Sequence, residues 1–300
     1  MTATTLEQPG ATTKTSRRGS SPTRRGTRRF LPGRVPGWVG AVLWLGVVIV
    51  PIYWVLMTSF RSQQNFFVDK PLDLPSDPSL ANYGLVFEMG FARYFLNSAV
   101  VTVGAVAITI FVSLLASYTI VRNNTPLSRR SLNLFLLGLA IPVQSAIIPI
   151  FYMITRMQLY DTLLAIILPS AAFAIPITII IFTNFLRDIP SELFESMRLD
   201  GASEIKMLWR LVLPLSVPAI STTAIYNGVN VWNNFLFPLV LTQSPETRVL
   251  PLALWTFQGE LTINVPAMMA AIVLSALPPL TLYVVGRRHL IAGMTAGFGK

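Results

Sequence analysis

The chain has no cysteine and a single histidine, His289. The first absence excludes a disulfide framework, and the two together exclude a metal site built from cysteine and histidine. Charged residues are also scarce, at 12% of the chain, against about 25% in globular domains. Because 53% of the residues are hydrophobic, the composition indicates a membrane protein. We expect neither a metal nor a cofactor.

Six stretches without Asp, Glu, Lys or Arg each exceed the roughly 20 residues with which a helix crosses a bilayer. They are Trp38–Ser59, Tyr94–Val121, Ser131–Thr155, Thr162–Leu186, Leu211–Pro245 and Leu261–Gly286. Strand-length segments of alternating polarity are absent, so helices are the structure that can satisfy the backbone hydrogen bonds in lipid. The sequence therefore predicts an all-α integral membrane protein with six transmembrane helices.

The basic residues are distributed unevenly among the connections. Of the 23 Lys and Arg, 18 lie before the first stretch, between the second and third, between the fourth and fifth, or after the sixth. Because cytoplasmic loops are enriched in Lys and Arg, we predict that both termini are cytoplasmic. An even number of spans places the termini on one side as well. We expect the chain in the cell (plasma) membrane.

These features divide the chain into five segments. We expect a disordered basic tail over residues 1–36, a first transmembrane helix over 37–59 and an extracytoplasmic loop over 60–92. The other five spans form a core over 93–287, and a cytoplasmic tail follows over 288–300. The basic tail is most simply a topology anchor with an attraction to anionic lipid, and we expect no nucleic-acid partner.

A polar segment over residues 188–214 interrupts the core. Asp188 and Pro190 favour a helix start, Gly201 favours a left-handed helix end, and Ser203 favours a second start. The segment is thus predicted to be a helical hairpin. Its apolar stripes are Leu193, Phe194 and Met197 in the first helix and Ile205, Leu208, Trp209 and Val212 in the second. These stripes require burial against the rest of the chain, lipid head groups or a partner's groove, and the pattern leaves all three open.

The hairpin resembles the EAA motif of permease subunits in binding-protein-dependent ABC importers. That motif reads Glu-Ala-Ala, three residues, Gly, nine residues and Ile-x-Leu-Pro. Here Glu195 begins the motif, Gly201 follows at the same spacing, and residues 211–214 read Leu-Val-Leu-Pro. Ser196, Met197 and Leu211 depart from the pattern. Within the family the chain is similar to the smaller permease of maltose-type sugar importers, through residues 288–297, Asn97-Ser98 and Trp232-Asn233-Asn234-Phe235.

The resemblance implies the type I ABC importer permease fold and half of a pathway for a sugar or oligosaccharide. It implies a heterodimer with a second permease subunit, two copies of a cytoplasmic ABC ATPase and an extracytoplasmic solute-binding protein. The residues that it places against the ATPase are Glu195, Asp200, Gly201, Ala202, Leu211 and Pro214, and in the C-terminal tail Gly293, Thr295 and Gly297. The chain has no Gly-x-x-x-x-Gly-Lys-Ser/Thr loop. We therefore expect a transport subunit rather than an enzyme, with ATP hydrolysed by a partner.

The fifth stretch carries polar side chains that are candidates for a solute path. They are Asn227, Asn230, Trp232, Asn233 and Asn234. Amides pair with hydroxyl groups, and aromatic rings cover the apolar faces of sugars. The alternative is that these groups join neighbouring helices, as buried polar groups in membranes do.

There are three alternative functions. A permease of the same architecture for a non-sugar solute is the first. An ion-coupled secondary transporter would carry a carboxylate within its spans, whereas all 13 acids lie outside the six stretches. A membrane enzyme would need a convergent set of acids, bases or metal ligands, which the spans do not supply.

Overall fold

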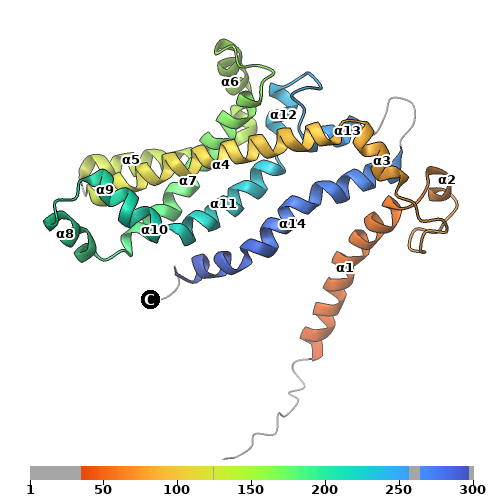
Figure 1. Ribbon diagram of the computed structural model, residues 1–300, viewed down its shortest axis with the longest axis horizontal. Coiled ribbons are helices and arrows are strands. Elements are labelled where there is room, and N and C mark those ends of the chain that lie inside the picture. The colour runs from red at the N-terminus through yellow and green to blue at the C-terminus, as the bar shows by residue number, and fades with distance from the viewer. Residues whose placement is uncertain (1–34, 124, 257–263, 297–300) are drawn as a thin grey trace, which may run out of the picture. The chain divides into compact units, whose positions relative to one another are not determined.

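The structure is a computed structural model that describes residues 35–123, 125–256 and 264–296. Within these ranges the regular secondary structure is helical, as predicted (Figure 1). The chain divides into two compact units, residues 1–48 and 49–300, and helix α1 (Val35–Ser59) belongs in part to each. The predicted disordered tail lies outside the described residues, apart from the first two residues of α1.

Long helices alternate with short ones in the larger unit. The long helices are α4 (Phe91–Arg122), α7 (Leu163–Arg187), α11 (Val217–Trp232) and α14 (Val265–Ala296). The shorter ones are α2 (Gln63–Phe66) and α3 (Ala81–Glu88), which precede α4, and, between the long helices, α5 (Pro126–Gly138), α6 (Val143–Arg156), α8 (Ser191–Leu199), α9 (Glu204–Met207), the π-helix η2 (Leu208–Val212), α10 (Leu213–Leu215), α12 (Leu236–Leu241) and α13 (Leu250–Thr256). The chain is a multi-pass membrane protein.

The predicted spans correspond to single helices in four cases and to bent pairs in two. Among the described residues, α1, α4, α7 and α14 are each long and apolar enough to cross a membrane. The third span is divided into α5 and α6, which meet at 101°. The fifth is bent by 71° just before α11. Pro142 and Pro214 lie next to the two bends, where a missing backbone N–H weakens helical continuity. Six spans result if each bent pair counts as one.

Helices α4 and α7 pack against each other along most of their length. Three hydroxyl groups spaced one helical turn apart on α4 face backbone carbonyls of α7, at 3.2 to 3.5 Å. The pairs are Thr109 with Ala171, Ser113 with Ile175, and Ser117 with Ile179. Small side chains let the two backbones approach, and their hydroxyls bond across the interface. The two helices therefore form one closely packed pair.

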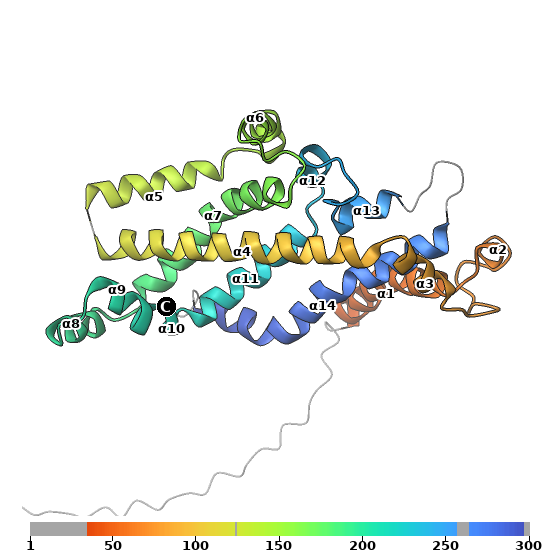
Figure 2. The same ribbon diagram turned by 45° about the horizontal axis from the view of Figure 1, so that its top comes forward.

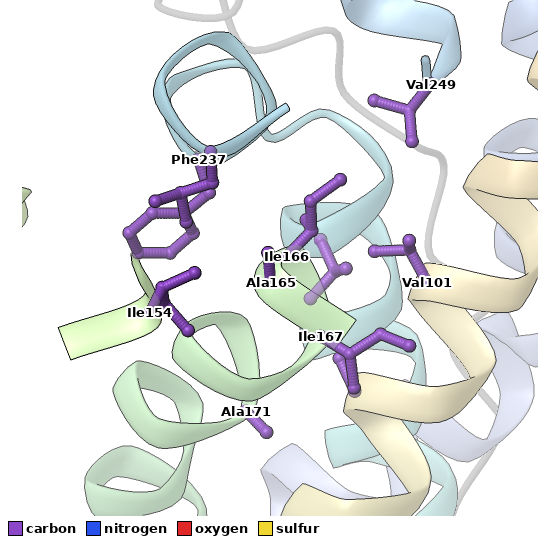
Figure 3. Close-up of a cluster of buried hydrophobic side chains, with 11 residues drawn as sticks. Val101, Ile154, Ala165, Ile166, Ile167, Ala171, Phe237 and Val249 are labelled. Carbon is purple, nitrogen blue, oxygen red and sulfur yellow. The ribbon is translucent and has the colours of Figure 1, made fainter. Parts of the chain in front are cut away.

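Two apolar clusters hold the two ends of this pair. One surrounds Ile166 and Phe237 and joins α4, α6, α7 and α12 (Figure 3). The other joins α4 and α7 to the hairpin of α8 and α9, described below. Figure 2 shows α8 and α9 beside the C-terminal end of α4, while α12 and α13 lie toward its other end. At 1.5 Å per residue, the 32 residues of α4 extend about 48 Å between the ends.

The predicted loop over residues 60–92 is folded rather than irregular. Arg61 is 1% exposed. Its guanidinium donates to the Lys70 and Asp73 carbonyl oxygens and lies 3.7 Å from the Asp69 carboxylate. The Asn82 amide donates to the Arg61 carbonyl oxygen at 2.7 Å. A buried charge is tolerated here because it is paired and hydrogen-bonded, so this arginine organises the segment.

Candidate functional site

The hairpin turns at Gly201 in the left-handed conformation that the sequence predicts, with φ of +73°. The Gly201 N–H donates to the Arg198 carbonyl oxygen at 3.0 Å, and the Ala202 N–H donates to the Met197 carbonyl oxygen at 2.9 Å. These two bonds make a Schellman motif, in which a glycine ends the helix and the next residue packs back on it. Ala202 is buried, so a small residue fits this position.

The predicted helix starts are half correct. Ser203 caps α9, because its Oγ accepts a hydrogen bond from the Lys206 N–H at 3.3 Å. The prediction for Asp188 is wrong. Its N–H closes the last turn of α7 by donating to the Phe185 carbonyl oxygen, and α8 begins only at Ser191. Pro190 precedes that start in an extended conformation, with ψ of 134°.

The stripe predicted for the second hairpin helix is shifted. Leu208 and Val212 are buried as expected, but Met207 is buried with them, while Ile205 and Trp209 are 71% and 54% exposed. Trp209 lies within the π-helix over Leu208–Val212, in which the Leu213 N–H donates to the Leu208 carbonyl oxygen. A π turn holds more residues than an α turn, so the 3.6-residue spacing fails here. Pro214 follows directly and has no N–H to donate.

The buried members of the two stripes pack on the same chain, which is one of the three surroundings that the sequence left open. We call the cluster the hairpin seat. It consists of Leu114 and Tyr118 of α4, Phe182 and Leu186 of α7, Ala219 of α11, and Phe194, Met197, Ala202, Met207, Leu208 and Val212 of the hairpin. A second set of apolar side chains remains exposed on the hairpin: Leu193, Leu199, Ile205 and Trp209. Leu199 is 89% exposed, which is high for an apolar residue in an ordered helix.

Polar contacts also hold the hairpin, and sequence reasoning missed them. The Tyr118 hydroxyl donates to one Glu204 carboxylate oxygen at 2.6 Å, and Arg198 Nη2 donates to the other at 2.7 Å. The Arg122 guanidinium lies 4.2 Å from the centre of the Phe194 ring. Tyr118 and Glu204 are 86 positions apart in the sequence, so no local pattern indicates that they pair.

The residues predicted to couple to an ATPase differ in their exposure to solvent. Glu195, Asp200 and Gly201 are exposed, as is Pro214. Ala202 is buried and Leu211 is half-buried. In the predicted tail, Gly293 and Thr295 lie in the last turns of α14, so the helix continues where a tail was expected. Gly297 lies outside the described residues.

Three of the five candidates for the solute path line one cavity of about 340 Å³. Asn227, Asn230 and Asn234 share it with Ser170, Phe173, Tyr226 and Phe237, among others. The other two candidates lie elsewhere. Trp232 donates through Nε1 to the Ser275 carbonyl oxygen at 3.1 Å, and Asn233 donates to the Val229 carbonyl oxygen within its own helix.

The amides in this cavity form hydrogen bonds within the protein. Asn227 donates to the Thr178 hydroxyl at 2.9 Å and thereby joins α11 to α7. Asn234 accepts from the Phe237 N–H at 3.1 Å and caps α12. The interhelical role weighed from the sequence therefore holds for Asn227. Ser170, which the sequence did not single out, is 4% exposed, and its hydroxyl has no partner in the described protein.

The opposite end of α7 carries a second organised polar contact. Asp161 has φ of +60°, and its Oδ1 accepts from the Gln243 N–H at 2.8 Å, the Ser244 N–H at 3.0 Å and the Thr247 hydroxyl at 2.7 Å. The Gln243 bond, with those of Thr247 and Ser244, outweighs desolvation and lowers the pKa of Asp161 from 3.8 to about 2. Asp161 thus ties the turn before α7 to the segment after α12.

Known proteins resemble the chain over most of its length. Residues 105–295 match the family model described as binding-protein-dependent transport system inner membrane component. A putative ABC transporter permease protein, ORF2, of Caldicellulosiruptor sp. is 38% identical over 86% of this chain and 94% of its own. The diacetylchitobiose uptake system permease protein NgcG of Streptomyces coelicolor is 32% identical over 85% of both chains. A chain of a bacterial ABC transporter that imports the polysaccharide alginate has the same fold, with a TM-score of 0.76 at 23% identity, over 85% of this chain and 96% of that one.

Proposed function

We propose, because this chain belongs to the family of binding-protein-dependent transport system inner membrane components, that it is a permease subunit of an ATP-driven ABC sugar importer. It forms half of the translocation pathway for a sugar or oligosaccharide. The similarity to a diacetylchitobiose permease and the shared fold with an alginate importer chain support this solute class. The same architecture with a non-sugar solute is the alternative.

The partners in this proposal follow from the family and from the hairpin. A second permease subunit completes the pathway as a heterodimer, and a solute-binding protein delivers the sugar outside the cell. Two copies of a cytoplasmic ABC ATPase supply the energy. Both termini and the hairpin face the cytoplasm, on the side where 18 of the 23 basic residues lie.

The hairpin is the element that couples this chain to the ATPase. The observation that carries this role is the division of its surface. One face is fixed on the hairpin seat, while Glu195, Asp200 and the 89% exposed Leu199 point away from it. An exposed apolar patch beside charged groups marks a protein interaction site. By the same resemblance, Gly293, Thr295 and Gly297 contact the ATPase from the C-terminal tail.

The solute path runs past the cavity lined by Asn227, Asn230 and Asn234. A neutral, hydroxyl-rich solute suits a site with amides, aromatic rings and no formal charge. Phe173 and Phe237 supply the rings, and the unpartnered Ser170 hydroxyl supplies a further polar group. Trp232 and Asn233 were proposed from the sequence as well, but they lie outside this lining.

Gly201→Leu tests the coupling role. The left-handed conformation is unfavourable for a residue that carries a Cβ atom. A bulky side chain at this turn would also occupy the proposed contact surface. We expect the variant to insert into the membrane but to lose its ATPase on purification, or to lose solute-stimulated ATP hydrolysis. The matched control is Gly84→Leu, at a glycine in α3 with φ in the ordinary helical range and open space around it. Normal ATPase binding and transport by Gly201→Leu would refute the assignment.

A further inference from the structure

The hairpin is connected to the transmembrane helices by two routes of different stiffness. The covalent route to α11 passes through the π-helix η2, Pro214 and the 71° bend at Ser216. Prolines and π turns are the points at which helices bend. The non-covalent route leads to the C-terminal ends of α4 and α7, through side-chain contacts and the hairpin seat, to which α11 adds the small buried side chain of Ala219.

Glu204 is the centre of the non-covalent route. One carboxylate oxygen accepts from the Tyr118 hydroxyl of α4 at 2.6 Å, and the other accepts from Arg198 of α8 at 2.7 Å. The acid itself belongs to α9. A single side chain therefore joins both arms of the hairpin to one transmembrane helix.

The two bonds of Glu204 differ in strength. The ion pair with Arg198 is open to water, with side chains 59% and 54% exposed, and such pairs contribute little. Tyr118 is only 8% exposed, and a hydrogen bond between a buried hydroxyl and a carboxylate is short and strong. Of the two bonds, the one to α4 therefore contributes more to holding the hairpin in place.

A second contact strengthens the same attachment. Arg122, one turn beyond Tyr118 on α4, places its guanidinium 4.2 Å from the centre of the Phe194 ring, a cation–π arrangement. Phe194 is itself 4% exposed and belongs to the seat. Both arms of the hairpin are thus attached to the same end of α4, which packs along α7.

We propose that Glu204 is a positioning residue that locks the hairpin to α4 through Tyr118. A displacement of the hairpin by its ATPase then moves α4 and α7 together, while the bend at Ser216 absorbs the change relative to α11. This inference rests on the proposed coupling function. It adds the helix pair that receives the motion and the side chains that transmit it.

Tyr118→Phe and Glu204→Gln test the lock in the intact transporter, reconstituted in vesicles with its partner subunits. Tyr118→Phe removes one oxygen and keeps the ring in the seat. We expect both variants to retain their ATPase, while solute transported per ATP hydrolysed falls by roughly threefold to tenfold, the range that one typical hydrogen bond supports. Glu204→Gln weakens the bond by removing the charge of the acceptor. The double variant should fall no further than the more affected single variant, because Tyr118→Phe leaves no bond for Glu204→Gln to weaken.

Tyr152→Phe is the matched control, since its hydroxyl accepts from Arg156 on α6, away from the hairpin, and it should transport at the wild-type ratio. A wild-type ratio in both Tyr118→Phe and Glu204→Gln, with ATPase bound, would overturn the lock and leave the coupling function intact. A wild-type chain that binds no ATPase would overturn both. A variant that is only destabilised would yield less assembled transporter, but its ratio of solute transported to ATP hydrolysed would stay at the wild-type value. The two effects are therefore measured separately.

Discussion

At the scale of single residues, the side chains that organise this molecule are acids and hydroxyls outside the apolar stretches or at their ends. Asp161 ties the turn before α7 to residues 243–247, and Glu204 ties the hairpin to α4. Each accepts bonds from segments more than 80 positions away. Local sequence patterns carry no information about such pairs, and neither was predicted.

Asp161→Asn should lower the melting temperature of the detergent-purified protein by a few degrees at neutral pH. The pKa of the carboxyl is about 2 in the folded chain and 3.8 ordinarily. A lowered pKa means that the charged form stabilises the fold, so the contribution is complete above pH about 4 and disappears as the pH falls toward 2. The difference between wild type and variant should shrink over that range. Asp77→Asn, at an exposed acid, is the control, and a difference that stays constant with pH would contradict the explanation.

Residue identity did predict the turn of the hairpin. Gly201 and Ser203 have the backbone preferences that end one helix and start the next, and both are found in those roles. Asp188 has an equal preference for a cap, but Pro190 delays the start of α8. A residue's preference for a helix end therefore predicted the boundary correctly where its neighbours favoured the same boundary, and failed where a neighbouring proline did not.

At the scale of elements, hydropathy located the spans and missed their bends. The stretches Tyr94–Val121 and Thr162–Leu186 agree closely with α4 and α7. The stretch Ser131–Thr155 covers two helices at 101°, because length and composition do not record direction. The π-helix at Leu208–Val212 had a similar effect on the hairpin stripe, since it exposes Trp209.

The α4–α7 pair depends on small side chains at its interface. Ser113 is fully buried and faces the Ile175 carbonyl oxygen. Ser113→Leu should separate the two helices and destabilise the protein by about 1–3 kcal/mol, as overpacking does. The control is Thr119→Leu, an exposed hydroxyl on the same helix that bonds only its own turn at Leu115. Equal thermal stability of the two variants would show that the close approach is not stabilising.

At the scale of the whole molecule, the two ends of α4 have different tasks in the proposed function. One end carries the hairpin and faces the ATPase. The other end carries Asn97, whose amide donates to the Glu246 and Arg248 carbonyl oxygens at 2.8 Å. Six spans, an all-helical fold and a permease family were predictable from composition and one motif. The cavity with Ser170 was not, because a serine in an apolar helix has no distinctive pattern.

The central claim is that the hairpin contacts an ATPase, and site-directed cross-linking tests it most directly. The chain has no cysteine, so Leu199→Cys and Leu74→Cys each introduce a unique thiol at a highly exposed position for a thiol-linked photo-cross-linker. In membranes that contain the assembled transporter, Leu199→Cys should cross-link to the nucleotide-binding subunit, and Leu74→Cys should not. Cross-linking of that subunit through Leu74, with none through Leu199, would contradict the account.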